Sequence, residues 1–151
     1  NAFVSNKAEL CHNFSEPHQR WATGCLYDNC SVSGLEACLN MANRGFFGTG
    51  HGWSGVQTMF YNSKSERSDF KVDSPKGGIN WGIGSTGITR NGAGFWESWG
   101  ANVLPRSLYL SQLKDRLGIQ AVENISIEAQ RVGGIEQLLK DWAGNGKLTG
   151  N

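Results

Sequence analysis

Short apolar segments, each ended by Gly, Asn, Asp or Ser, follow one another along the chain to about Gly94. Clear examples lie at residues 21–27, 30–34, 56–61 and 79–84. Segments of this length between turn-forming residues are typical of β-strands. Glycine provides 21 of the 151 residues and proline only 3, which indicates tight turns in a folded chain and not a disordered Pro/Gly linker. We therefore expect this part of the chain to be mainly β.

Length and charge limit the classes of function. A chain of 151 residues is near the usual size of one domain and long enough to bury a core. Fourteen Lys and Arg face thirteen Asp and Glu, which leaves a net charge of only +1. This balance argues against a strongly basic nucleic-acid binder and against a polybasic membrane-surface protein. No apolar run approaches the roughly 18 residues of a membrane-spanning helix. We expect no nucleic-acid partner and no membrane span.

A loose internal repeat is visible in the first half of the chain. Trp21 and Trp53 are each followed by a small residue and a strand-like segment, and the segment 26–29 resembles the segment 60–63. Repeats of this length made of short strands suggest a solenoid or a propeller. A right-handed parallel β-helix fits the pattern, because its coils carry apolar residues inward and Gly, Asn and Asp at the turns. A β-propeller or another solenoid is the minor alternative.

The last third of the chain has helical patterns instead. Residues 105–117 carry leucines at helical spacing, and Gly118 suits the position after a helix end. Residues 135–142 give a second amphipathic helix, and residues 125–129 between the two alternate as a short strand does. We assign residues 1–104 to parallel β-helix coils and residues 105–151 to a helical cap and tail.

Cysteines and glycosylation sequons favour an oxidising, secretory history, so we expect a secreted or extracellular glycoprotein with one or two disulfides. The alternative is four buried free thiols in a cytosolic protein. Four cysteines allow three pairings, and the sequence does not choose among them. The candidate residues are Cys11, Cys25, Cys30 and Cys38 for disulfides and Asn13, Asn29 and Asn124 for glycosylation.

Several motifs in a fixed order then point to a family. They are Pro-His-Gln-Arg-Trp-Ala-Thr-Gly at 17–24, Asn-Arg-Gly-Phe-Phe-Gly-Thr-Gly-His-Gly-Trp at 43–53, Asn-Trp-Gly-Ile-Gly at 80–84 and the stretch 105–118. Together they resemble the C-terminal portion of secreted pectate-lyase-like proteins, over about residues 11–118. The resemblance implies the C-terminal coils of a right-handed parallel β-helix with an α-helical C-terminal cap. Such proteins are usually several times longer and include lyases, hydrolases, epimerases and inactive relatives, so the fold does not give the function.

A lyase acting on an acidic polysaccharide needs a base, a cation that neutralises the sugar carboxylate, and an acid for the leaving oxygen. The resemblance makes His18, Arg20, Arg44 and His51 the catalytic candidates. His18 and Arg20 are separated by a single residue and would face the same side of a strand. Arg44 and His51 flank the glycine-rich turn 45–52. The alternative for each residue is structural, with its side chain bonded to backbone at a turn.

The sequence gives weaker evidence for sugar-stacking, hydrolase, metal and cofactor sites. Trp53, Trp81 and Trp96 are candidates for stacking on sugar rings, although tryptophan also fills cores. No pair of carboxylates suggests a hydrolase, and Glu97 is the best isolated acid. We expect no metal and no cofactor; calcium is left open, although no cluster of oxygen ligands supports it.

Two functions follow. The first is an extracellular pectate-lyase-like β-helix domain that binds or assembles on polysaccharide as part of a larger or multi-chain particle. The alternative is a polysaccharide lyase that cleaves an acidic glycan by β-elimination. The chain starts at Asn1 without an initiator Met, which suggests a processed or excised product. We expect an open N-terminal sheet edge covered by the other half of a cleaved precursor or by further copies of the chain.

Overall fold

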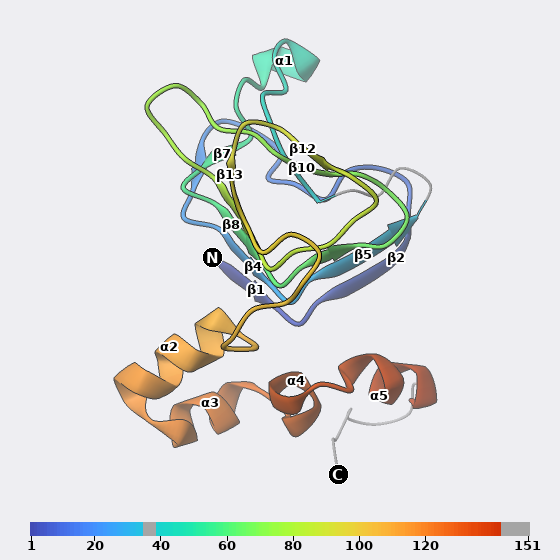
Figure 1. Ribbon diagram of the computed structural model, residues 1–151, viewed down its shortest axis with the longest axis vertical. Helices are drawn as coiled ribbons and strands as arrows, with labels where there is room; N and C mark the ends of the chain where they lie inside the picture. The colour runs from blue at the N-terminus through green and yellow to red at the C-terminus, as the bar shows by residue number, and fades with distance from the viewer. Residues whose placement is uncertain (35–38, 143–151) are drawn as a thin grey trace.

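The computed structural model describes residues 1–34 and 39–142, and its largest sheet has five parallel strands. Successive windings of the chain overlie one another in Figure 1, and each adds one strand to this sheet. In spatial order the strands are β1 (Ala2–Val4), β4 (Leu26–Asp28), β8 (Met59–Tyr61), β11 (Trp81–Ile83) and β13 (Phe95–Glu97).

Three smaller sheets complete the windings, and they too are parallel. The first contains β2 (Lys7–Cys11), β5 (Ser31–Gly34) and β9 (Lys64–Ser65). The second contains β12 (Arg90–Asn91), β10 (Phe70–Val72) and β6 (Asn40–Met41). The third pairs β3 (Ala22–Thr23) with β7 (Gly55–Val56).

The register between β4 and β8 is shifted by one position from the repeat seen in the sequence. Tyr27 pairs with Phe60, whereas the sequence repeat placed it opposite Tyr61. A shift of one position moves every side chain of a strand to the other face. Phe60 therefore enters the core and is fully buried, and it stacks on Tyr27 with ring centroids 4.8 Å apart.

The core lies between the sheets, inside the windings. Its buried members are Val32, Leu39, Met41, Phe60, Phe70 and Val72. Phe70 meets Phe60 edge to face at 5.1 Å and Trp96 at 5.8 Å, an arrangement that aromatic rings favour. This core fixes β10, whose Phe70 and Val72 point inward, so Lys71 between them points outward.

Helices occupy the C-terminal part of the chain. They are α2 (Leu108–Leu117), α3 (Ile119–Ile125), α4 (Glu128–Val132) and α5 (Ile135–Asp141), and the short α1 (Phe47–Gly50) lies in an earlier loop. Helices α2 to α5 line one side of the stacked sheets, and α1 projects from the opposite side (Figure 1). The strand expected at residues 125–129 is wrong. Helix α3 ends there and α4 begins, with the Gln130 side chain accepting from the Ile127 N–H at 3.1 Å.

A buried carboxylate attaches α2 to the sheets. Asp28 Oδ2 accepts from the Ser107 hydroxyl at 2.6 Å and from the Tyr109 N–H at 2.8 Å. Ser107 in turn accepts from the Leu110 N–H, which makes it the N-cap of α2. This cap is why the helix begins at Leu108 and not at Pro105, where the sequence pattern suggested its start.

The expected fold class is wrong. We expected a mainly β chain, the C-terminal coils of a right-handed parallel β-helix with an α-helical C-terminal cap. The strands instead form small sheets. Of the described residues, about 30% are strand and 24% helix, and no long parallel β-helix solenoid is evident among them.

Unequal windings account for this difference. In the five-stranded sheet Phe60 pairs with Tyr27 on one side and with Gly82 on the other, and Gly82 pairs in turn with Trp96. The winding from Tyr27 to Phe60 is therefore much longer than the winding from Gly82 to Trp96. A solenoid stacks similar repeats, and these windings are too unequal for that.

The membrane expectation agrees with the structure. Among residues 1–34 and 39–142, no helix has both the length and the apolar character needed to cross a bilayer.

Candidate functional site

The structure brings together the four residues that the sequence singled out for chemistry. His18, Arg20, Arg44 and His51 form one group, named here the Arg–His cluster, where the segment before β3 meets the loop that carries α1. That loop is closed at its base by the Arg44 N–H, which donates to the Gly52 carbonyl at 2.7 Å, and by an antiparallel bridge between Asn43 and Trp53.

Arg44 is the best-fixed member of the cluster. Its Nε lies 3.1 Å from Glu16 Oε1, and its Nη1 donates to the His18 carbonyl at 2.8 Å. The same Nη1 lies 3.3 Å from His18 Nδ1. The Phe47 ring lies 5.8 Å from the guanidinium carbon.

Glu16 forms an ion pair with Arg44 and holds its guanidinium in place. Its side chain is only 4% exposed, and it also accepts from the Asn40 side-chain amide. Burial raises the pKa of the Glu16 carboxyl, and Arg44, Asn40 and Lys71 act in the opposite direction. Sequence reasoning missed Glu16, although it directly precedes the motif that contains His18.

His51 packs against His18, with ring centroids 4.5 Å apart. Burial lowers the pKa of His51, and the nearby His18, Arg44 and Arg20 lower it further. Its Nδ1 is buried and has no hydrogen-bond partner among the described residues. Gly48 makes room for the ring, because a Cβ at that position would lie 2.5 Å from His51 Nε2. The structure thus places the His51 ring, with its lowered pKa, beside His18 and two arginines.

Arg20 reaches across to the α1 loop. Its Nη2 donates to the Thr49 carbonyl at 3.0 Å and to the Thr49 hydroxyl at 3.1 Å. Arg20 and Trp21 both have positive φ, 55° and 60°, a conformation that costs free energy for residues other than glycine. The Trp21 N–H donates to the Trp53 carbonyl at 2.9 Å, which holds this strained pair in place. Strained backbone of this kind is frequent at functional sites.

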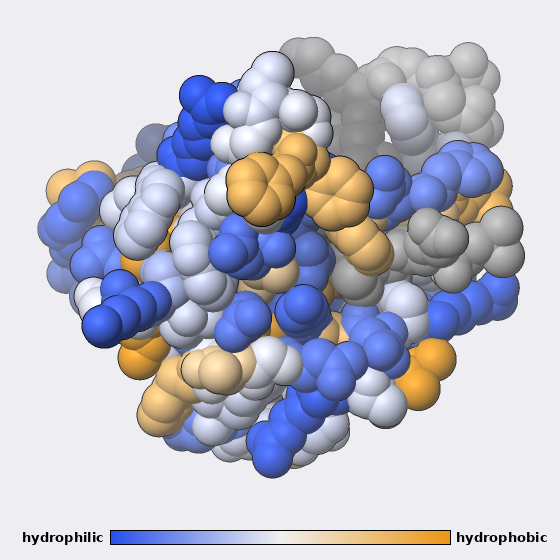
Figure 2. Space-filling view, turned by 90° about the horizontal axis from the view of Figure 1, so that it is seen from above, coloured by the Kyte–Doolittle hydropathy of each residue, from blue (hydrophilic) through white to orange (hydrophobic). Residues whose placement is uncertain are grey.

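Beside the cluster lies a pocket of about 370 Å³, named here the polar pocket, to which Arg44 and Glu16 both contribute. Phe14 and Phe47 also line it and are half exposed or more. Figure 2 looks onto the side of the molecule that carries α1 and shows apolar side chains gathered within a largely hydrophilic face. The exposed Phe46 and Phe47 were a signal in the sequence, since adjacent aromatics in a glycine-rich turn have little core to fill.

The predicted sugar-stacking tryptophans lie in three different places. Trp53 is half-buried at the base of the α1 loop, next to the cluster. Trp81 lies on β11, in the five-stranded sheet. Trp96 packs over Gly82, where a Cβ would lie 2.5 Å from the ring, and its ring centroid is 5.3 Å from that of Trp99. Trp96 therefore acts as part of the core.

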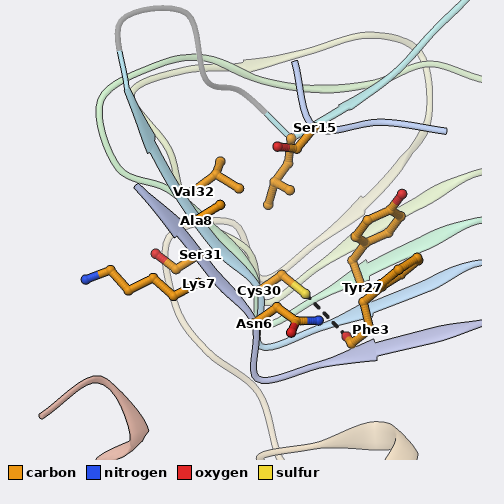
Figure 3. Close-up of a pocket in the computed structure, with 10 residues that line it drawn as sticks. Phe3, Asn6, Lys7, Ala8, Ser15, Tyr27, Cys30, Ser31 and Val32 are labelled. Atoms are coloured by element: carbon orange, nitrogen blue, oxygen red, sulfur yellow. Dashed lines mark hydrogen bonds between the residues drawn. The ribbon is translucent and has the colours of Figure 1, made fainter. Parts of the chain in front are cut away.

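The described cysteines, Cys11, Cys25 and Cys30, are free thiols, and Cys38 lies outside the described residues. The Cys30 thiol is buried and donates to the Phe3 carbonyl at 3.3 Å, and burial raises its pKa to about 11. It lines a separate hollow of about 300 Å³ among the first windings, with Phe3, Tyr27 and Val32 (Figure 3). This hollow contains none of the catalytic candidates.

The three sequon asparagines differ in their surroundings. Asn13 and Asn124 are exposed. The Nδ2 of Asn29, the atom that a glycan would occupy, donates to the Arg106 carbonyl at 2.5 Å. No group of three or more His, Cys, Asp or Glu that would suit a metal ion occurs in the described ranges.

The chain matches no protein-family model, no curated protein and no solved structure. The resemblance to pectate-lyase-like proteins therefore stays a prediction, and the function must be argued from the site itself.

Proposed function

We propose that this chain binds a carboxylated polysaccharide through the Arg–His cluster. The observation that carries the proposal is the fixation of Arg44 on Glu16 and on His18, which holds one face of its guanidinium beside a pocket with aromatic residues at its rim. Arginine suits carboxylates because its planar fork donates two parallel hydrogen bonds.

Exposed aromatic rings around the cluster support a sugar polymer over a small anion. Phe46 is 99% exposed, Phe47 67% and Trp21 52%, and all three lie on the segments that carry the cluster. Exposed large apolar side chains that gather on one face of a protein mark a binding surface. Sugar rings offer C–H faces to aromatic rings and hydroxyls to polar groups, so one polymer satisfies both features.

Binding of polygalacturonate, measured by isothermal titration calorimetry, tests the proposal, with dextran as the uncharged comparison. Replacing Arg20 by Met removes one cation that donates only to Thr49 among the described residues, so the fold is expected to survive. We expect affinity for polygalacturonate to fall about tenfold, the value of one charged hydrogen bond. Arg116→Met, on the exposed face of α2, is the matched control and is expected to leave affinity unchanged. Equal binding of dextran, or no effect of Arg20→Met, would overturn the proposal.

A second candidate, β-elimination on the same polymer, is favoured by one observation: the His51 ring packs against His18 near Arg20 and Arg44, and these charges and burial lower its pKa. In this reaction a His51 nitrogen takes the proton next to the sugar carboxylate while an arginine neutralises that carboxylate. The electron pair forms the ring double bond, the glycosidic bond breaks, and the leaving oxygen takes a proton from water.

Ultraviolet absorbance of the unsaturated product separates the two candidates. A lyase produces this absorbance and loses it on His51→Ala while the variant still binds polygalacturonate. A chain that binds the polymer without ever producing the absorbance is a binding protein, and the lyase candidate is then wrong.

A further inference from the structure

The floor of the polar pocket is a row of three polar side chains, named here the Asn–Lys–Asn row. Asn40 on β6, Lys71 on β10 and Asn91 on β12 are in register across three neighbouring parallel strands. Neighbouring strands of a sheet lie about 4.8 Å apart, so the three side chains leave the same face at that spacing. Phe70 and Val72 on either side of Lys71 face the core, which orients the lysine away from it.

Two carboxylates fix the orientation of the two side-chain amides in this row. Glu16 accepts from Asn40 Nδ2, and Asp69 Oδ2 accepts from Asn91 Nδ2 at 3.0 Å. The other oxygen of Asp69 accepts from the Thr89 hydroxyl at 2.6 Å. A carboxylate only accepts, so each amide must present its nitrogen to the acid, and both amide oxygens remain for a ligand.

The ammonium of Lys71 is the third free group. It has no hydrogen bond or ion pair in the part of the chain that the structure describes, although its charge reaches the Glu16 carboxyl. The pocket therefore offers donors at Lys71 and Arg44 and acceptors at the two amide oxygens and at Asp69. Two cations, Arg44 and Lys71, balance two carboxylates, Glu16 and Asp69, so the pocket has no net formal charge.

This combination selects a ligand class. A phosphate or other small anion would face two carboxylates, and a metal cation would face two basic side chains. An uncharged molecule with several hydroxyls both donates and accepts, and its C–H face suits Phe14 and Phe47 at the rim. A volume of about 370 Å³ is at the lower end of the ~300–1,000 Å³ seen for small-molecule sites, which fits one sugar ring and not a longer segment.

We infer that the polar pocket binds one neutral hexopyranose unit, and that the polymer bound by this chain carries a neutral sugar next to a uronate. This inference rests on the proposed function, because Arg44 belongs both to the Arg–His cluster and to the pocket. The pocket is then the specificity subsite, and the Arg–His cluster is the subsite for the acidic unit.

The test is an NMR titration of the ¹⁵N-labelled chain with three tetrasaccharides. Tetragalacturonate contains only uronate, β-1,4-galactotetraose contains only neutral sugar, and the rhamnogalacturonan backbone tetrasaccharide alternates the two. We expect the alternating tetrasaccharide to bind most tightly and to shift the side-chain amide signals of Asn40 and Asn91. Tetragalacturonate is expected to shift signals of the cluster and to leave these two amide signals in place.

Lys71→Met separates the two proposals. It is expected to lower affinity for the alternating tetrasaccharide about tenfold, toward that of tetragalacturonate, and to leave tetragalacturonate binding unchanged. Lys76→Met, on an exposed turn, is the matched control, and thermal unfolding of each variant checks the fold. If the Asn40 and Asn91 signals respond to none of the three ligands while the cluster responds to uronate, the subsite inference is wrong and the proposed function stands. If the cluster responds to no uronate either, the proposed function fails with it.

Discussion

Outward-pointing polar side chains occur both where α2 joins the sheets and in the polar pocket, but with different partners. Where α2 joins the sheets, Asp28 on β4 and Asn62 just after β8 point outward, and the chain from Val103 to Tyr109 covers them. In the polar pocket, the Asn–Lys–Asn row and its two carboxylates also point outward, and the pocket above them stays open. Outward polar side chains on these sheets thus either attach another segment or remain available to a ligand.

In the covered place, the side chain of Asn62 is bonded entirely to main chain. Asn62 Nδ2 donates to the Val103 carbonyl at 2.8 Å and to the Arg106 carbonyl at 3.0 Å, and its Oδ1 accepts from the Val103 N–H at 2.8 Å. Buried polar groups with all partners in place stabilise one arrangement of the chain. In the open place, the amide oxygens of the row and the ammonium of Lys71 have no such partners in the described residues, and these are the atoms a ligand would meet.

The largest expected effect is on folding, from Asp28→Ala. Removing this carboxylate leaves the Ser107 hydroxyl and the Tyr109 N–H without an acceptor in a buried place. Each orphaned group costs about 1–3 kcal/mol, so the free energy of unfolding is expected to fall by roughly 3 kcal/mol. Urea unfolding followed by far-UV circular dichroism measures the loss, and Asp28→Asn, which keeps one acceptor oxygen, is expected to lose less.

Glu16→Ala is the substitution in the polar pocket that corresponds to Asp28→Ala. Arg44 keeps its bond to the His18 carbonyl and is partly exposed, and the Asn40 amide alone loses its acceptor in a buried place, so we expect a loss of about 1–2 kcal/mol in the free energy of unfolding. Binding of polygalacturonate is expected to weaken more than folding does, because Arg44 loses its anchor. Equal destabilisation by Glu16→Ala and Asp28→Ala would remove the distinction between the two places.

The next prediction concerns the stability of the attachment of α2 to the sheets. Asn62→Ala removes the four side-chain hydrogen bonds to the segment 103–106 and is expected to cost about 2 kcal/mol. Hydrogen exchange is the sharper measurement, because amides of α2 should exchange faster while those of β10 do not. Asn91→Ala, an exposed amide of the pocket, is the control and should leave exchange in α2 as it was. Unchanged exchange in α2 with Asn62→Ala would mean that other contacts hold the helix.

Local sequence patterns predicted part of this structure. The strands β5, β8 and β11 lie within the short apolar segments, β4 overlaps one of them, and helices occur at both stretches of helical spacing. The sheet register and the fold class were not predictable in the same way. They depend on contacts between windings of unequal length, so that Met59 pairs with Leu26 on one side and with Trp81 on the other.

The four residues of the Arg–His cluster lie in motifs that are visible in the sequence, and the structure places them together, but their role stays a prediction. The Asn–Lys–Asn row was missed for a physical reason. A polar residue between two buried ones, such as Lys71 in Phe70–Val72, looks the same in a sequence whether it faces bulk water or a pocket. Only the pairing of β10 with β6 and β12 brings the three side chains together.

The pH dependence of stability gives a smaller effect with a definite sign. Burial raises the pKa of Asp28 above its ordinary value of 3.8. An acid whose pKa is raised on folding binds more protons in the folded state, so its contribution is complete below the ordinary pKa and is lost as pH rises through the raised one. The free energy of unfolding of the parent chain, relative to Asp28→Asn, is expected to fall from about pH 4 toward neutral pH. A rise over this window would mean that the hydrogen bonds from Ser107 and Tyr109 outweigh burial.

The smallest effect concerns α5, which is attached by exposed charges and not by a buried carboxylate. Glu136 contacts both Lys7 on β2 and Lys140 on its own helix, and these hydrogen bonds lower its pKa to about 2. A lowered acid pKa gives stability above the ordinary value of 4.5 that is lost as pH falls toward about 2. Glu136→Gln is therefore expected to reduce the loss of stability at acidic pH. It is expected to change the free energy of unfolding at neutral pH only slightly.

Salt distinguishes this attachment from that of α2. Ions screen exposed pairs far more than buried ones, so the small effect of Glu136→Gln is expected to vanish at about 1 M salt, whereas the effect of Asp28→Ala should persist. Urea unfolding at low and high salt measures both. A Glu136→Gln effect that survived high salt would mean that the ion pair is shielded from solvent, and α5 would then be held to β2 as firmly as α2 is held to β4.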